Sequence, residues 1–362
     1  MSLVEQALPY VRAISAYQPG KPITELAREM GIPVESIVKL ASNENPLGMS
    51  PKAKLAVQAA IDGIERYPDQ FDLIKAVATR AGVAQSQVVL GNGSNDVLDL
   101  IARVFLAPGR SAIFAQHAFA VYPLATLSTG AELIAVPARD YGHDLAAMRA
   151  AIRPDTRLIW IANPNNPTGN FLPYPEVRAF LESVPRDVVV VLDEAYNDYL
   201  PPADRVDVAG WIKDFPNLVV CRTLSKIYGL AGLRVGYGLA SVEVADLMNR
   251  IRQPFNVNNL ALAGAIAALD DDEFLQASYE LNRSGMAQIV AGLEKLGLEY
   301  IKPHGNFVTF KAGDAAAVNQ KLLQQGVIVR PIAGYGLPEW LRVTIGTAAE
   351  NSRFLEALEK AL

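Results

Sequence analysis

A single lysine, Lys226, interrupts a mostly apolar, glycine-punctuated segment, TLSKIYGLAGLR (223–234). The segment follows an apolar run, residues 217–222, that is typical of a buried strand. Because burial disfavours the charged form of lysine, a lysine at the end of a core strand is a candidate neutral nucleophile. The alternative is an exposed loop on which the lysine has no chemical role.

The polar side chains around Lys226 suggest a ligand. Thr223 and Ser225 flank the lysine, and Arg234 follows later in the same segment. Hydroxyl and guanidinium groups beside an amine suit the binding of a phosphate ester next to an imine-forming lysine.

A second motif, GNGSND (91–96), follows a predicted strand and opens a predicted helix. Ser94 and Asn95 would present backbone N–H groups at the helix N-terminus, where anions bind. The pattern is neither G-x-G-x-x-G nor a Walker A loop, so it does not indicate a dinucleotide or a nucleoside triphosphate. An ordinary helix-capping turn is the alternative.

Two more motifs follow predicted strands. In ANPNNPTGN (162–170) the prolines fix a rigid turn, in which Asn166 could offer its amide as a hydrogen-bond donor. In LDEAY (192–196) Asp193 ends a buried strand, where a carboxylate needs a cation such as a protonated ring nitrogen. A plain turn and a helix cap are the respective alternatives.

The elements that would position these residues form an α/β pattern. Apolar runs without polar alternation are separated by amphipathic helical segments, which predicts a mostly parallel sheet sandwiched by helices. Ligands bind such sheets beyond the carboxyl ends of the strands, where these motifs fall. The predicted strands are 87–90, 111–115, 132–137, 157–162, 187–193, 217–222 and 234–240.

A smaller α+β domain is predicted from the rest of the chain. After a long helical stretch, 258–296, the predicted strands 306–312, 327–332 and 341–346 are separated by one helix and a loop, and a final helix follows. We expect a large domain at 46–250 and a small domain formed by 1–45 together with 251–362.

Composition narrows the class of protein. The 362 residues carry a net charge of −5, with a pI near 5.4, so no electrostatic feature predicts nucleic acid or an anionic membrane as a partner. The start of the chain lacks the apolar stretch of a signal peptide, and no run is long enough to span a membrane. The one cysteine, Cys221, excludes an intrachain disulfide. We therefore expect a cytoplasmic protein.

In their order and spacing, the motifs make the sequence resemble the fold-type I pyridoxal-phosphate aminotransferases over essentially its whole length. Within them, the histidinol-phosphate aminotransferases are the group most similar in detail. The motifs that carry the resemblance are ASNENPLG (41–48), RYPD (66–69), NPNNPTG (163–169), DEAY (193–196), TLSKIYGLAGLRVGYG (223–238), VIVRP (327–331) and LRVTIGT (341–347).

The resemblance implies pyridoxal 5'-phosphate as the cofactor and a role for each motif. Lys226 would form the imine with the cofactor and move the proton, and Asp193 would keep the pyridinium nitrogen protonated. Asn166 and Tyr196 would donate hydrogen bonds to the phenolic oxygen. Phe119 falls where the family stacks an aromatic ring on the cofactor, often a tyrosine, although a core aromatic is the alternative. The residues implied at the phosphate are Ser94, Asn95, Thr223, Ser225 and Arg234.

The resemblance also implies substrate contacts. Arg342 and Arg330 would bind the substrate's anionic group, with Tyr17 and Asn43 nearby; surface ion pairs are the alternative for the arginines. Tyr67 resembles the tyrosine that reaches the cofactor phosphate of the partner subunit, which implies a homodimer. The three histidines, His117, His143 and His304, show no metal-ligand spacing, and no metal is expected.

The implied activity is transamination between L-histidinol phosphate or imidazole-acetol phosphate and glutamate or 2-oxoglutarate, by a ping-pong mechanism in histidine biosynthesis. An aminotransferase for phenylalanine or tyrosine is the nearest alternative, because the same pocket would hold a flat ring and an anion. The more distant alternatives are a pyridoxal-phosphate lyase or decarboxylase and a cofactor-binding regulatory module. The regulatory type carries an N-terminal DNA-binding domain, for which the residues before ASNENPLG leave no room.

Overall fold

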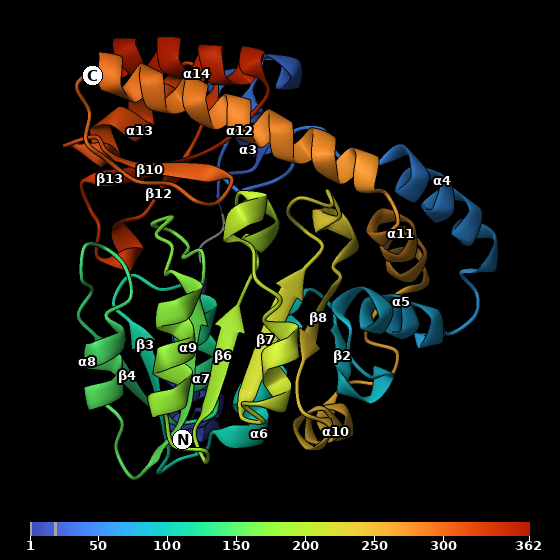
Figure 1. Ribbon diagram of the computed structural model, residues 1–362. Coiled ribbons are helices and arrows are strands. Elements are labelled where there is room, and N and C mark those ends of the chain that lie inside the picture. Colours follow the sequence, from blue (N-terminus) through green and yellow to red (C-terminus); the bar gives the residue numbers. More distant parts are fainter. Residues whose placement is uncertain (1, 18–19) are drawn as a thin grey trace.

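The computed structural model describes residues 2–17 and 20–362. Within them, seven strands form one sheet in the order β2-β8-β7-β6-β5-β3-β4. Only β8 runs antiparallel to its neighbours in this described sheet, so the predicted mostly parallel sheet is confirmed (Figure 1). The strands are β2 (Val88–Gly91), β3 (Ser111–Ala115), β4 (Glu132–Val136), β5 (Thr156–Ala162), β6 (Val189–Asp193), β7 (Leu218–Thr223) and β8 (Gly236–Leu239).

Helices cover both faces of this sheet, because the central strands are apolar on both sides. Leu192 of β6 packs into one core cluster and Val191 into the other, as expected when successive side chains point to opposite faces. The first cluster contains side chains of α5 (Phe71–Ala81), α8 (Leu145–Ala150), α9 (Tyr174–Ser183) and α11 (Asn259–Leu269). The second contains side chains of α6 (Ser94–Phe105), α7 (Val121–Ser128) and α10 (Val242–Ile251).

A smaller unit lies above the carboxyl ends of the central strands (Figure 1). Its antiparallel sheet has the order β12-β13-β10-β9 and packs against three helices. The strands are β9 (Tyr300–Ile301), β10 (Phe307–Lys311), β12 (Arg330–Pro331) and β13 (Trp340–Thr344). The helices are α12 (Asp272–Lys295), α13 (Ala315–Gln324) and α14 (Ala348–Ala361).

The strand predicted at 327–332 divides into two. β11 (Val327–Ile328) pairs with β1 (Val38–Lys39), whereas β12 pairs with β13. Val329 lies between these pairings and is buried in the core of the smaller unit. One apolar run therefore serves two sheets, and the first of them ties the N-terminal segment to the smaller unit.

The core clusters favour a revised division of the chain. α11 packs on α4 (Pro51–Ala60) and α5, and Val257 to Leu269 contribute to the core of the large sheet, so a boundary at residue 250 would cut that core. α12 then crosses from the large unit to the smaller one (Figure 1). We propose that the boundary between the large and the smaller domain lies within α12. The smaller domain would then consist of residues 1–45 and the chain beyond α12.

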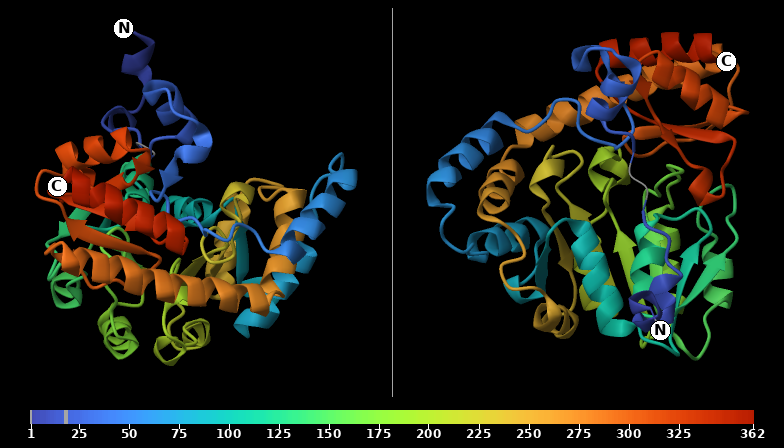
Figure 2. Two further views of the ribbon diagram at one scale, coloured as in Figure 1. Left: turned by 90° about the horizontal axis from the view of Figure 1, so that it is seen from above. Right: turned by 180° about the vertical axis from the view of Figure 1, so that it is seen from behind.

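The N-terminal segment contacts both units. α3 (Ile23–Met30) packs with Ile328 in a small cluster beside β11, on the smaller unit. α1 (Leu3–Gln6) and α2 (Pro9–Arg12) lie beside the large unit, where α2 contacts α7 (Figure 2). The N-terminal segment of the proposed smaller domain thus also contacts the large unit.

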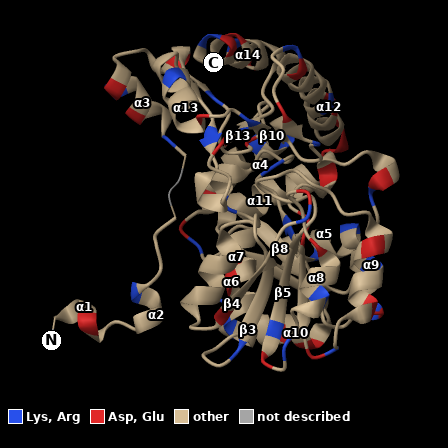
Figure 3. Ribbon diagram, turned by 90° about the vertical axis from the view of Figure 1, so that its left-hand side faces the viewer, with Lys and Arg blue, Asp and Glu red and all other residues tan. Residues whose placement is uncertain are grey.

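The outer helices of the described residues carry both acidic and basic side chains (Figure 3). Charges of both signs are interspersed along the outer helices, for example on α14 and α9 (Figure 3). Within residues 2–17 and 20–362, every helix is too short or too polar to cross a bilayer.

Candidate active site

A pocket lies at the carboxyl ends of the central strands and is bordered by the smaller unit. Fourteen of the fifteen side chains predicted to form the site line this pocket, and Tyr67 does not. The fourteen are Tyr17, Asn43, Ser94, Asn95, Phe119, Asn166, Asp193, Tyr196, Thr223, Ser225, Lys226, Arg234, Arg330 and Arg342.

Lys226 follows β7 and extends into the pocket. Its Nζ donates a hydrogen bond to the carbonyl oxygen of Ser42, at 3.1 Å. Burial, together with the positive charges of Arg342 and Arg234, lowers the pKa of Lys226 to about 8, although Glu44 and Asp193 oppose this shift. An appreciable fraction of the amine is therefore neutral near physiological pH, as a nucleophilic lysine requires.

Asp193 ends β6 and is almost fully buried. Its Oδ2 accepts a hydrogen bond from Tyr122 Oη at 2.8 Å, and its Oδ1 accepts one from the backbone N–H of Ala195 at 3.2 Å. Burial raises the pKa of Asp193 to about 6, and the hydrogen bonds from Tyr122 and Ala195 reduce the shift. Within residues 2–17 and 20–362, no ion pair involves this carboxylate, which suits a site for a cationic ligand atom.

Tyr122 is a site residue that sequence reasoning missed. It is fully buried on α7 and stacks on Trp160, with the ring centroids 5.1 Å apart. The one sequence signal was its closeness to Phe119, which lies three residues earlier, just before α7. Phe119 contacts the Tyr122 ring edge-on, at 5.7 Å between centroids.

The N-terminus of α6 forms an anion-binding corner of the pocket. The helix begins at Ser94, so the N–H groups of Ser94 and Asn95 have no acceptor within the helix. Gly93 precedes them with φ +81°, and a Cβ at this position would lie 2.5 Å from the Arg234 guanidinium. Thr223 and Ser225 are buried beside the same corner. Backbone dipoles, hydroxyls and a guanidinium thus converge as a phosphate group requires.

Four polar side chains along the pocket form two hydrogen-bonded pairs. Asn43 Nδ2 donates to Tyr196 Oη at 2.8 Å, and Arg342 donates to Asn166 Oδ1 at 2.6 Å. The amide nitrogen of Asn166 remains available as a donor. Burial raises the pKa of Tyr196 to about 12, although Arg342 and Asn43 oppose the shift, so its hydroxyl stays protonated.

The two predicted substrate arginines differ in their surroundings. Arg342 on β13 is buried, donates to the carbonyl oxygen of Ala41 at 2.8 Å, and has an Nε without a hydrogen-bond partner among the described residues. For Arg342 the alternative of a surface ion pair is therefore wrong. Arg330 on β12 lies over the ring of Tyr17, with its guanidinium carbon 5.5 Å from the ring centroid.

Tyr67 and Tyr335 depart from the expected set in opposite ways. Tyr67 lies outside the pocket, is 81% exposed and stacks on Phe255 at 4.5 Å, so its predicted contact with a partner subunit stays a prediction. Tyr335, in the 3-10 turn Ala333–Tyr335, lines the pocket but was not predicted. Its carbonyl oxygen accepts a hydrogen bond from His117 Nδ1 at 2.6 Å, which ties the smaller unit to the large one.

Taken together, the fold and the pocket define a pyridoxal-phosphate-type aminotransferase scaffold, and the comparisons agree. The family model described as aminotransferase class I and II matches residues 35–358. The chain belongs to this family.

Full-length relatives specify the group within the family. The chain is 83% identical to "Histidinol-phosphate aminotransferase 1" of Dechloromonas aromatica, with both chains covered completely. It is 61% identical to the protein of that name from Thiobacillus denitrificans, covering 98% of this chain and 93% of that protein. The chain is thus a member of the histidinol-phosphate aminotransferase group.

A solved structure agrees with the fold. The histidinol-phosphate aminotransferase of Sinorhizobium meliloti, in complex with pyridoxal-5'-phosphate, superimposes with a TM-score of 0.90 at 27% identity. The match covers 98% of this chain and 97% of that chain.

Proposed function

We propose that the protein transfers an amino group between L-histidinol phosphate and 2-oxoglutarate, forming imidazole-acetol phosphate and glutamate, in histidine biosynthesis. The observation that carries this proposal is the 83% identity, over the whole length, to a histidinol-phosphate aminotransferase. The relatives favour this substrate over phenylalanine or tyrosine, and no observation favours the alternative of an aromatic aminotransferase.

The cofactor is pyridoxal 5'-phosphate, and the chemistry of the pocket fits it. The N-terminus of α6 with Arg234 suits the phosphate, the buried Asp193 carboxylate suits a protonated ring nitrogen, and the amine of Lys226 suits the aldehyde. When bound, this cofactor withdraws electrons from the substrate's reacting carbon and carries the amino group between the two half-reactions.

Each side chain then has a defined task. Lys226 would supply the amine for the cofactor's aldehyde and would move the proton of the substrate carbon; its lowered pKa supports both tasks. Asp193 would hold a proton on the ring nitrogen, and Asn166 and Tyr196 would donate to the phenolic oxygen. The phosphate would be held by Ser94, Asn95, Thr223, Ser225 and Arg234, and Phe119 would pack on the ring.

Arginines from the smaller unit bind the substrates. Arg342 and Arg330 face the pocket together and form its cationic wall, with Tyr17 and Asn43 beside them. In histidinol phosphate their anion is the phosphate, whereas in glutamate it is a carboxylate. The same two guanidinium groups thus serve both half-reactions, which is consistent with a ping-pong sequence.

We also propose that the protein acts as a cytoplasmic homodimer in which Tyr67 reaches the cofactor phosphate of the partner subunit. Its exposure and its absence from the pocket of its own chain support this assignment. No metal takes part in the proposal, and the described residues hold no cluster of three potential metal ligands.

Single-turnover absorption spectroscopy tests the function. The cofactor-loaded protein is mixed separately with histidinol phosphate, phenylalanine and glutamate, and the loss of the cofactor band is followed. Rapid loss with histidinol phosphate and glutamate, but much slower loss with phenylalanine, is expected. Phenylalanine matching histidinol phosphate would move the assignment to an aromatic aminotransferase, and loss with none of the three would contradict transamination.

A further inference from the structure

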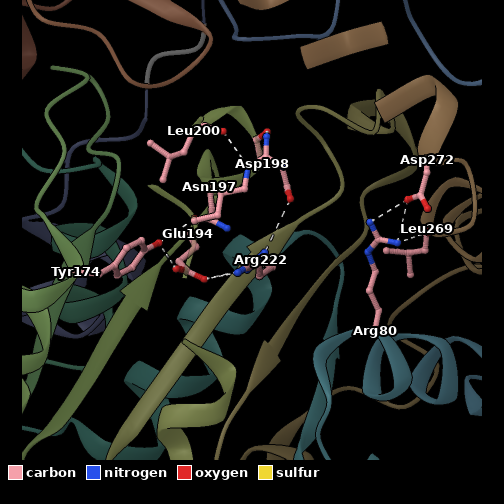
Figure 4. Close-up of polar contacts among 10 residues, drawn as sticks. Arg80, Tyr174, Glu194, Asn197, Asp198, Leu200, Arg222, Leu269 and Asp272 are labelled. Carbon is pink, nitrogen blue, oxygen red and sulfur yellow. Dashed lines mark hydrogen bonds and ion pairs between the residues drawn. The ribbon is translucent and has the colours of Figure 1, made fainter. Parts of the chain in front are cut away.

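A buried ion pair lies behind the pocket, on the opposite face of the large sheet. Arg222 donates two hydrogen bonds to Glu194 Oε2, from Nε at 2.9 Å and from NH2 at 2.6 Å (Figure 4). The Glu194 side chain is fully buried, and that of Arg222 is 20% exposed. Neither residue lines the pocket.

Each member of the pair is the chain neighbour of pocket residues. Glu194 directly follows Asp193, and Arg222 directly precedes Thr223. Because successive strand residues point to opposite faces, Asp193 and Thr223 face the pocket while Glu194 and Arg222 point away from it. Fixing the pair therefore fixes the directions in which Asp193 and Thr223 leave their strands.

A third segment joins the pair. Tyr174, at the start of α9 and just beyond the turn that carries Asn166, donates to Glu194 Oε1 at 2.6 Å (Figure 4). Burial, and the negative charge of Glu194, raise the pKa of Tyr174 well above its ordinary value, so the hydroxyl remains a donor. The start of α9, the residue that follows β6 and a residue of β7 thus meet at one carboxylate.

Stability alone does not account for this pair. Removing two charges from water carries a desolvation penalty, which their mutual attraction offsets only when the geometry is good. Proteins in which well-packed apolar residues replace a buried ion pair are often equally stable. The pair does, however, impose a fixed distance and direction on two neighbouring strands, because two N–H groups of the planar guanidinium converge on Glu194 Oε2 while Tyr174 holds Oε1. A positional role fits this geometry.

We infer that Glu194 and Arg222 are positioning residues that hold the ends of β6 and β7 in the register required for cofactor binding. The inference rests on the proposed function, since the ligand being positioned for is pyridoxal phosphate. The pair acts through Asp193 on one strand and through Thr223, Ser225 and Lys226 on the other.

The test is the double variant Glu194→Leu/Arg222→Met, which removes both charges together. Tyr174 keeps an acceptor in this variant, because its hydroxyl also lies 2.8 Å from Asn197 Oδ1. The matched control is Glu132→Gln/Arg153→Met, which removes a two-pronged but exposed pair outside the pocket. Three quantities are measured: the thermal midpoint, the dissociation constant of pyridoxal phosphate for the apoprotein, and the pH dependence of the bound cofactor's absorption.

We expect the double variant to unfold near the parent's temperature but to bind the cofactor at least about tenfold more weakly, with a shifted pH dependence of its absorption. The control variant should match the parent in all three measurements. A folded double variant with the parent's dissociation constant and pH dependence would overturn the inference. A parent that does not bind pyridoxal phosphate would instead overturn the proposed function.

The variant Arg222→Lys provides a second test of the inference if the double variant fails to fold. It keeps the charge beside Glu194 but replaces the planar guanidinium with a single ammonium group, so the fold survives while the geometry is relaxed. A weaker affinity for the cofactor is again expected at an unchanged thermal midpoint, and the parent's affinity would count against the inference.

Discussion

At the residue scale, the site holds ionisable groups where their usual charges are disfavoured. The pKa of Asp193 is raised to about 6 and that of Lys226 is lowered to about 8, in both cases first of all by burial. Such opposed shifts within one pocket are typical of sites built for proton transfer and covalent chemistry. They also predict that burying these two ionisable groups lowers the stability of the apoprotein.

Asp193→Asn tests this cost. Because the pKa of Asp193 is raised on folding, the folded chain retains a proton that the unfolded chain releases between pH 4 and 6. The parent apoprotein should therefore lose about 3 kcal/mol of unfolding free energy from this group as the pH rises through that window, and the asparagine variant should not. Urea denaturation of both apoproteins at pH 4 and pH 7 measures the difference. Parallel pH dependences would contradict it.

Lys226→Ala should abolish transamination and leave the protein folded. The pKa of the amine is lowered on folding, so the cost of its charge is present at pH 7 and disappears with the side chain. The apoprotein's thermal midpoint should thus equal or exceed that of the parent. Appreciable turnover by the variant, measured with histidinol phosphate and 2-oxoglutarate, would end the assignment of Lys226.

At the element scale, the turn before α6 decides the shape of the anion-binding corner. Gly93 has a backbone conformation that side chains rarely adopt, and the Arg234 guanidinium occupies the place of its missing Cβ. Glycine is therefore needed both for the turn and for the approach of Arg234 to the helix N-terminus. Sequence reasoning recognised the glycine-rich turn but not this second requirement.

Gly93→Ala should weaken cofactor binding by about tenfold or more, because the new Cβ displaces the Arg234 guanidinium. Gly82→Ala is the control, since Gly82 also has a positive φ but nothing lies within 4 Å of its Cβ position. Both variants should lose about 1–2 kcal/mol of stability through backbone strain. Equal cofactor affinities, measured by titrating the two apoproteins, would exclude the proposed contact of Arg234 with the phosphate.

At the scale of the whole molecule, an exposed apolar region lies outside the pocket, around Tyr67. Large hydrophobic side chains exposed there come from α4, from the segment that follows it, from the start of α5, and from the loop before α11. They are Leu55, Ile61, Ile64, Tyr67, Phe71 and Phe255. A region of this kind is typical of a protein–protein interface, which supports the proposed homodimer.

Mixed dimers test whether two subunits share each site. Lys226→Ala and Tyr67→Ala are each expected to be impaired as homodimers, but a mixed dimer contains one site with both Lys226 and the partner's Tyr67 intact. After subunit exchange, activity should rise toward about one quarter of the parent's. Mixing Lys226→Ala with Asp193→Asn is the control, because both changes affect a subunit's own pocket and no site is restored. Absence of recovery despite exchange would exclude sharing of Tyr67.

Much of the fold and most of the candidate site could be predicted, because their signals are local. Buried parallel strands are continuous apolar runs, so β3 coincides with its prediction at both ends and β7 is displaced by one residue. The motifs after β2, β5, β6 and β7 follow strands that end at one edge of the sheet, and parallel topology then brings their side chains into one pocket. The order of the motifs along the chain therefore predicted which side chains lie together in the pocket.

Only the tertiary structure decided which side chains meet across distant segments. Tyr122 contacts Asp193 from another layer, Arg222 meets Glu194 from the next strand, and α11 joins the large core although it follows the last predicted strand of that sheet. None of these partners is marked by its own neighbours in the sequence. The physical reason is that a buried polar group selects its partner through packing and distance, which exist only after the layers have assembled.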